Sequence, residues 1–139
     1  MTFTPAAAQT IHDFLFDTNT AVSDYDLILT GDLGKVGSEL LYELMMSEYG
    51  IDITPVHNDS GLMIYNLSEQ DVHAGGSGCA CCGTVMCSKI LNDINNGKLN
   101  KVLVVATGAL LSAISPFQGQ SIPSVAHGVL ITKGRGKDE

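Results

Sequence analysis

Two short apolar runs constrain the fold of this chain more than any other feature. Residues 25–30 read YDLILT and residues 101–107 read KVLVVAT, and a glycine follows each run directly. Continuous apolar runs of this length, bounded by turn residues, are typical of strands that are buried on both faces of a sheet. A third run, VAHGVLIT at 125–132, predicts a last strand. Strands of this kind need helices to cover them.

Helical periodicity appears between the predicted strands. Thr4 and Pro5 open an apolar stretch, and we expect Thr4 to be the N-cap because proline suits the first turn. Leu40, Leu41, Leu44 and Met45 lie at helical spacing and, with Met46, are expected in the core, and Gly50 is expected to be the C-cap. A buried helix is expected over 78–95 and a weak strand over 62–66. The predicted fold is therefore α/β, with a mixed β-sheet and helices packed on its faces.

Length and charge limit the kind of protein this can be. The chain has 139 residues, 45% of them hydrophobic, which is enough for one domain with a single core. The formal net charge of -8 argues against nucleic acid as a partner. No apolar run reaches the roughly 18 residues of a membrane span, and we see no signal peptide. The last residues, 133–139, are expected to form a solvated tail.

Three loops are placed where an α/β sheet gathers its ligands. They are GDLG at 31–34, HAGGSG at 73–78 and TGALLS at 107–112. Ligands collect in such sheets at strand ends, in loops that lead into helices. The glycines permit close backbone approach, and a helix entry exposes N–H groups that can hold an anion or a carbonyl oxygen. The alternative is a tight helix entry without a ligand.

Four cysteines lie between residues 79 and 87. Cysteines on one helix cannot surround a tetrahedral zinc ion, so we predict no metal site. Cys79, in the first turn of the expected helix, is a candidate catalytic thiol because a helix N-terminus lowers a thiol pKa. The alternative, which we favour, is that small residues let the helix approach the sheet closely.

The other polar candidates are an aspartate and four histidines. Asp32 could cap the following helix or hold a cation that bridges an anionic ligand. His127 lies in an apolar run and is expected to be a core histidine. His12 and His57 have no evident partners and are expected to face solvent. His73 precedes the glycine loop and could act there as a proton carrier or lie on the surface.

Four segments together resemble the stage V sporulation protein AD family, the thiolase-like component of the spore apparatus that moves dipicolinic acid. They are GDLGKVGSELL, HAGGSGCACC, KVLVVATGALLS and QGQSIPSVAHGV. The resemblance implies a thiolase-like half domain over 1–132 that corresponds to the C-terminal portion of longer family members. The catalytic cysteine of the superfamily then belongs to the missing N-terminal half.

The resemblance also implies that catalysis is lost. The related ketoacyl synthase III enzymes carry a histidine and an asparagine in their second half. Gly31 stands where that histidine would be, and Gly76 stands where the asparagine would be. Glycine has no side chain that could transfer a proton or hold a thioester oxygen. We therefore expect no enzyme activity and no cofactor. One alternative is a residual acyltransferase or thioesterase that uses Cys79 with His73. The other is a purely structural sporulation subunit.

What remains is an expected binding role. The resemblance implies that the ligand is dipicolinic acid or its calcium chelate, and that the protein supports uptake into the developing spore. It implies a peripheral location at the spore inner membrane, other stage V sporulation proteins as partners, and either a homo-oligomer or a separate N-terminal half. The candidate ligand-binding residues, chosen by loop position, are Gly31, Asp32, Leu33, His73, Gly75, Gly76, Ser77, Gly78 and Gly108.

Overall fold

The computed structural model describes residues 3–78, 80–109, 119 and 123–134. Four strands form one mixed sheet in the order β2-β1-β3-β4. The strands are β1 (Leu27–Thr30), β2 (His57–Asp59), β3 (Lys101–Ala109) and β4 (Ser124–Thr132). Strand β1 pairs in parallel with both β2 and β3, whereas β4 is antiparallel to β3. The expected α/β class with a mixed sheet is confirmed.

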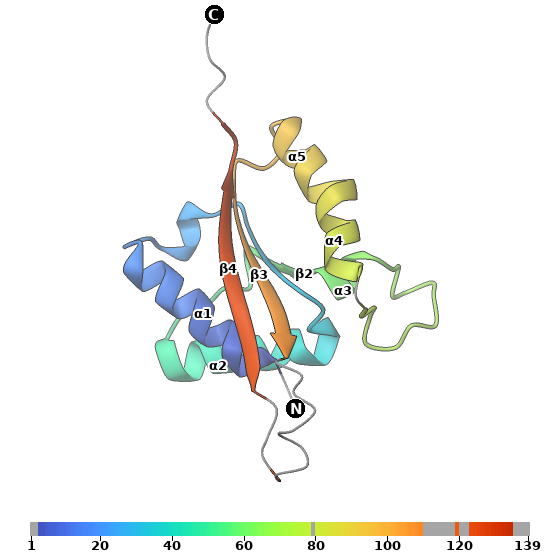
Figure 1. Cartoon of the computed structure of the whole chain (residues 1–139), viewed down its shortest axis with the longest axis horizontal. Helices are drawn as coiled ribbons and strands as arrows, with labels where there is room; N and C mark the ends of the chain where they lie inside the picture. Colours follow the sequence, from blue (N-terminus) through green and yellow to red (C-terminus); the bar gives the residue numbers. More distant parts are fainter. Residues whose placement is uncertain (1–2, 79, 110–118, 120–122, 135–139) are drawn as a thin grey trace, which may run out of the picture.

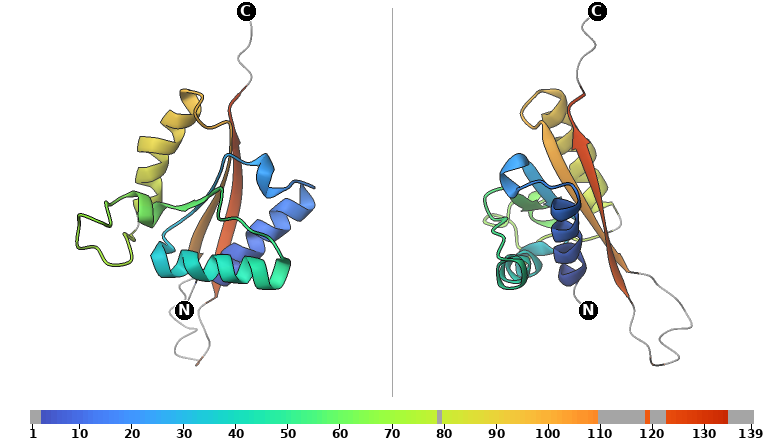
Figure 2. Two further views of the ribbon diagram at one scale, coloured as in Figure 1. Left: turned by 180° about the vertical axis from the view of Figure 1, so that it is seen from behind. Right: turned by 90° about the vertical axis from the view of Figure 1, so that its left-hand side faces the viewer.

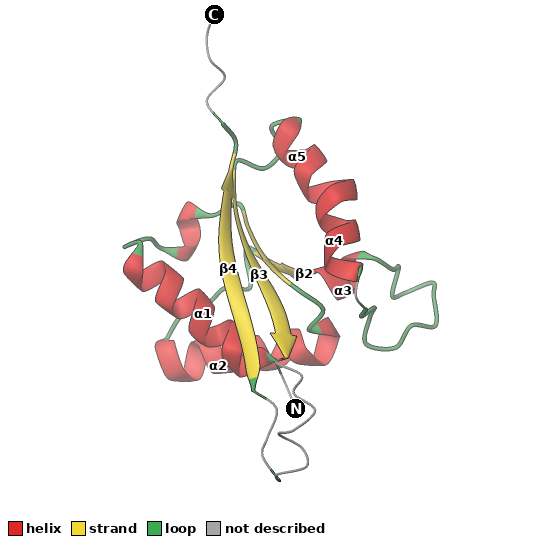
Figure 3. Cartoon of the chain, in the orientation of Figure 1, coloured by secondary structure: helices red, strands yellow, loops and turns green. Residues whose placement is uncertain are grey.

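Helices cover the two faces of this sheet (Figures 1 and 2). Helices α1 (Thr4–Asp17) and α2 (Gly34–Tyr49) lie on one face, and their apolar sides share a core with Ile28, Leu103 and Val105. The other face is covered by a continuous helical segment, α4 (Cys81–Val85), η2 (Met86–Ile90) and α5 (Leu91–Asn95). Short turns η1 (Val22–Asp24) and α3 (Ser60–Met63) complete the described elements (Figure 3).

The face under α4, η2 and α5 has a second apolar cluster. Alternation along β1 and β3 sends Leu29, Val102 and Val104 to this side, where they pack against Val85 and Ile90. The η2 segment is a π-helical turn within the longer helix. The opposite side of the helix is exposed at Cys87 and Leu91, so the expectation of a fully buried helix over 78–95 is wrong.

Several local predictions are confirmed. Strands were expected at 25–30, 101–107 and 125–132, and strands are present over most of these residues. Gly50 ends α2 in the left-handed conformation, with φ of 64°. Leu41 and Met45 are fully buried as expected, but Met46 is half exposed, so its expected place in the core is wrong.

Three local predictions are wrong. Thr4 is not the N-cap of α1; its hydroxyl instead donates to the carbonyl oxygen of Gly37 in α2. Residues 60–63 form the short helix α3 and not a strand, because Asp59 caps their N-terminus through the N–H of Gly61. Residues 57–59, expected in a loop, form β2. Within the described residues no helix is long and apolar enough to cross a membrane.

Candidate functional site

A buried carboxylate organises the loop that leaves β1. Asp59, fully buried at the end of β2, accepts hydrogen bonds at Oδ2 from the Thr30 hydroxyl (2.6 Å) and the Leu33 N–H (2.9 Å). Its Oδ1 accepts from the N–H groups of Gly34 (2.9 Å) and Gly61 (3.0 Å). Four donors match the lone pairs of one carboxylate. Asp59 therefore caps α2 and α3 together and fixes the loop at 31–34.

A histidine extends this network toward α2. His57 Nε2 lies 2.9 Å from Thr30 Oγ1, and His57 Nδ1 lies 2.8 Å from the Tyr42 hydroxyl. Since the single proton of the Thr30 hydroxyl goes to Asp59, His57 must donate from Nε2 and accept at Nδ1 from Tyr42. Burial lowers the pKa of His57 to about 4, so this neutral tautomer is the stable form. His57 is thus a half-buried structural residue with two side-chain partners, and the expectation that it faces solvent without a partner is wrong.

Asp32 lies where this loop faces the opposite loop at 73–78. Its backbone is in the left-handed region, with φ of 57°. The Asp32 carboxylate accepts from the Ser60 hydroxyl (2.8 Å) and from the Gly78 N–H (3.3 Å). It does not cap α2 with its side chain, so the capping interpretation of Asp32 is wrong; Asp59 has that role. The bonds of Asp32 instead join the two loops.

A cavity of about 270 Å³ opens between these loops and the end of β3. The Asp32 carboxylate is the charged group in its lining. The Thr107 hydroxyl donates to the carbonyl oxygen of Gly31, which ties the end of β3 to the loop after β1. The residues that line this cavity, called the Asp32 cavity below, are Phe3, Gly31, Asp32, Ser77, Gly78, Cys82, Ala106 and Thr107.

The glycines at 75 and 76 pack the loop onto α3. A Cβ on Gly75, which has φ of 117°, would lie 2.5 Å from the Gly61 carbonyl oxygen. A Cβ on Gly76 would lie 2.7 Å from both the Ile64 and the Tyr65 side chains. The Gly76 N–H also donates to the Gly61 carbonyl at 2.7 Å. These glycines therefore serve close backbone packing, and a larger residue at 76 would displace the loop.

The thiols near the cavity are poor nucleophiles. Burial, with the Asp32 carboxylate as a hydrogen-bond partner, raises the pKa of Cys81 to about 12. Burial also raises the pKa of Cys82, which lines the cavity. Cys79 lies outside the described residues. In the part of the chain that the structure describes, no three His, Cys, Asp or Glu side chains are grouped so that they could hold a metal ion.

The structure brings together four of the residues predicted for ligand binding: Gly31, Asp32, Ser77 and Gly78. Leu33 lines a smaller hollow next to this cavity, together with Val36 and Leu40. The side chain of His73 is almost fully exposed and does not line the cavity. Gly75, Gly76 and Gly108 also lie outside the lining, although Thr107, beside Gly108, belongs to it. The predicted loop at 107–112 is described only as far as Ala109.

Sequence reasoning missed Asp59, Thr30 and Cys82. Asp59 precedes Ser60 and Gly61, a pattern typical of a capping aspartate, and this was the available signal. Two further histidine predictions are wrong. His127 is exposed on the edge strand β4 and not in the core. His12 is half-buried; its ring stacks on Tyr49 with 4.1 Å between ring centroids.

These features define a class: an α/β domain with a cavity lined by one acidic residue where β1 and β3 end. Comparison with known proteins gives the family. The family model for Stage V sporulation protein AD (SpoVAD) matches residues 1–132. The Stage V sporulation protein AD of Bacillus subtilis (strain 168) is 48% identical over 132 residues, which are 95% of this chain and 38% of that relative. The chain therefore belongs to the SpoVAD family and spans under two fifths of that relative's length.

Proposed function

We propose that this domain binds the calcium chelate of dipicolinic acid in the Asp32 cavity, without catalysis, and supports its uptake into the developing spore. The volume of about 270 Å³ lies just below the range of small-molecule pockets, about 300–1,000 Å³, so the cavity has room for no more than a small, single-ring ligand. The family membership supports a role in sporulation. The observation that carries the proposal is the Asp32 carboxylate in the cavity wall.

Charge favours the chelate over the free dianion. No lysine or arginine is among the lining residues, and the carboxylate of Asp32 would repel a dicarboxylate. The backbone donors nearby are already used: Gly76 and Gly78 donate to Gly61 and Asp32. Calcium prefers oxygen ligands and accepts six to eight of them, so the bound chelate has coordination positions left for Asp32.

The state of the described thiols supports a binding role, and the alternative of a residual acyltransferase or thioesterase depends on Cys79, which lies outside the described residues. An attacking cysteine needs a thiolate, and Cys81 and Cys82 both have raised pKa values. His73, the one candidate base in the loop, points its side chain into solvent. Gly31 and Gly76 offer no replacement. None of these groups can accept a proton from a thiol in the Asp32 cavity.

The wider setting belongs to the same proposal. We place the protein at the periphery of the spore inner membrane, with other stage V sporulation proteins as partners. The regions of the relative that this chain does not span would complete the ligand site, whether they come from the same chain or from a separate one. Its 38% coverage of the relative is consistent with this arrangement.

Isothermal titration calorimetry tests the binding proposal. Calcium with dipicolinate is titrated into the 139-residue chain, beside calcium alone and dipicolinate alone. We expect saturable heat only when both components are present, and loss of that heat in Asp32→Asn. Asp71→Asn, on the exposed loop after α3, is the matched control and should bind normally. Binding of free dipicolinate with equal affinity would contradict the charge argument.

A further inference from the structure

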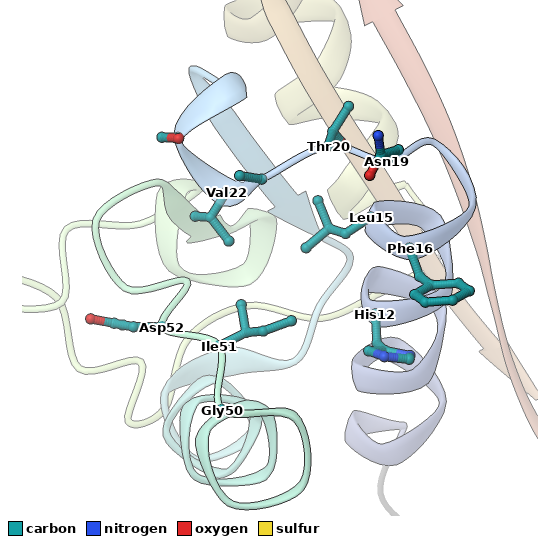
Figure 4. Close-up of a pocket in the computed structure, with 11 residues that line it drawn as sticks. His12, Leu15, Phe16, Asn19, Thr20, Val22, Gly50, Ile51 and Asp52 are labelled. Atoms are coloured by element: carbon teal, nitrogen blue, oxygen red, sulfur yellow. The ribbon is translucent and has the colours of Figure 1, made fainter.

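A second cavity, of about 680 Å³, lies between α1 and the segment that follows α2 (Figure 4). Its lining comes from the second half of α1, from residues 19–23 and from residues 50–52. None of these residues lines the Asp32 cavity. The volume falls within the range of small-molecule and side-chain pockets, about 300–1,000 Å³. We call it the α1 cavity.

One wall of the α1 cavity is aromatic. His12 stacks on Tyr49, and the Phe16 ring lies nearly parallel to His12, with 6.1 Å between centroids and 20° between planes. Phe16 is 77% exposed, which is unusual for a phenylalanine beside a cavity. Figure 4 shows the His12 and Phe16 rings side by side along α1. Tyr49 covers one face of the His12 ring, so the accessible flat surface of this wall is mainly that of Phe16.

A carboxylate stands across the cavity from this wall. Asp52 lies on the segment after Gly50, on the other side of the cavity in Figure 4. Its Oδ1 accepts from the Thr54 hydroxyl (2.6 Å) and the Thr54 N–H (2.9 Å), which fixes the side chain and leaves Oδ2 available. These hydrogen bonds lower the pKa of Asp52, so the group is ionised at neutral pH. Apolar side chains of Leu15, Val22 and Ile51 line the space between.

The surroundings of the α1 cavity are acidic. No lysine or arginine lines it, and the exposed residues Asp13, Asp17 and Asp24 belong to the same elements. Residues 1–88 contain twelve aspartates and glutamates and a single basic residue, Lys35. An anionic ligand such as a dicarboxylate is repelled here, whereas a cation is attracted.

We propose that the α1 cavity receives an arginine side chain from a basic segment of a partner protein. The guanidinium group lies flat on the exposed ring of Phe16, and the carboxylates of Asp13, Asp17 and Asp52 around the cavity attract its positive charge. Arginine suits this site better than lysine because its planar group stacks on an aromatic ring. Exposed aromatic residues paired with arginine are also frequent anchors of protein interfaces. This inference is independent of the dipicolinate proposal, since the two cavities share no residue.

Nuclear magnetic resonance titration tests this inference on the 15N-labelled chain. The probe is the peptide acetyl-Gly-Arg-Leu-Arg-Gly-amide, and the control is the same peptide with citrulline in place of arginine. Citrulline keeps the shape and removes the charge. We expect saturable amide shifts confined to α1, residues 19–23 and residues 50–52 with the arginine peptide, and much smaller shifts with the control. Shifts elsewhere, no shifts, or equal shifts with both peptides would overturn the proposal.

Two substitutions at exposed residues then measure separately how much the aromatic ring and the negative charge contribute to binding. Phe16→Ala removes the ring, and Asp52→Asn removes the charge while its amide oxygen can still accept from Thr54. Each substitution should lower the affinity of the chain for the arginine peptide by about twofold to fivefold. Asp71→Asn, on a distant exposed loop, should leave the affinity unchanged. Unchanged affinity in both cavity variants would refute the site even if the peptide binds.

Discussion

The ring of His57 donates from Nε2 to the hydroxyl of Thr30 over 2.9 Å, and that hydroxyl donates in turn to the buried Asp59. In the neutral form of His57, which burial favours, Nδ1 accepts from the Tyr42 hydroxyl. This relay connects α2, β1 and β2 behind the Asp32 cavity. The stability of the domain and the shape of its candidate site therefore depend on the same few polar groups.

Acidification should destabilise the domain through His57. Its pKa is about 4 when folded and 6.5 when unfolded, so the unfolded chain binds more protons between these values and stability falls as pH drops from 6.5 to 4. The loss is at most about 3 kcal/mol. Urea unfolding at pH 7 and pH 4.5 measures it. The variant His57→Gln should show a smaller pH dependence; an unchanged dependence would rule out His57 as its source.

Removing the charge of Asp59 should destabilise the fold strongly. In Asp59→Asn an amide N–H₂ replaces one acceptor oxygen and leaves buried N–H groups of the loop without a partner. We expect a loss of about 2–4 kcal/mol. Chemical unfolding of Asp59→Asn beside Asp71→Asn measures this. A loss of under about 0.5 kcal/mol, the range of ordinary surface substitutions, would contradict the assigned role of Asp59.

Alanine substitutions should distinguish a glycine that close backbone packing requires from a glycine where a side chain has room. In Gly61→Ala the added Cβ would collide with the backbone carbonyl oxygen of Gly76, so the loop at 73–78 must move. In Gly83→Ala, on the exposed side of α4, the Cβ meets nothing within 4 Å and should stabilise the helix by about 0.5–1 kcal/mol. Thermal unfolding compares the two. Similar melting temperatures for both variants would show that the glycine contact is not tight.

Cysteine reactivity should follow burial. Cys87 is exposed on the helix, whereas Cys81 is buried and has a pKa of about 12. Iodoacetamide at neutral pH should therefore label Cys87 first, Cys82 slowly and Cys81 last, as read by fragment mass spectrometry. Preferential labelling of Cys79 over Cys87 would instead support the alternative of a catalytic thiol at Cys79.

The chain alone should self-associate through the face that carries α5 and β4. Val129 pairs in register with Val104, so its side chain lies on the α5 side of the sheet, where it is exposed together with Leu91. Exposed apolar surface of this kind favours association. Sedimentation velocity should show concentration-dependent association that the double variant Leu91→Lys, Val129→Lys reduces. A monomer at high concentration would argue against this surface.

The sequence predicted β1, β3 and β4 because each coincides with a continuous apolar run, although β4 is an edge strand without a buried residue. It could not predict β2, because His57 and Asp59 are polar and pair with β1 only through contacts across the fold. The weak strand expected over 62–66 has an apolar run too short to separate a strand from a helical turn, and the Asp59 cap favours the helix over 60–63. In short segments, tertiary contacts can therefore override the secondary structure that the local sequence pattern predicts.

The same distinction applies to the candidate site. Loop position predicted that Gly31, Asp32, Ser77 and Gly78 lie together, because the loops after neighbouring strands share one edge of a sheet. The position of these residues in the loop could not predict that the His73 side chain is exposed to solvent and does not line the Asp32 cavity. Nor could it predict that Gly75 and Gly76 allow close packing of the backbone. Nor could it identify Asp59, whose partners Thr30 and Leu33 are distant along the chain.

Terbium luminescence gives the most direct test of a calcium dipicolinate site at Asp32. Terbium substitutes for calcium, dipicolinate sensitises its emission, and bound water shortens the emission lifetime. A carboxylate that replaces water on the ion lengthens the lifetime. We predict a longer lifetime of terbium dipicolinate with the native chain and with Asp71→Asn, and the free-solution lifetime with Asp32→Asn. An Asp32→Asn variant that lengthens the lifetime as much as the native chain would contradict the site.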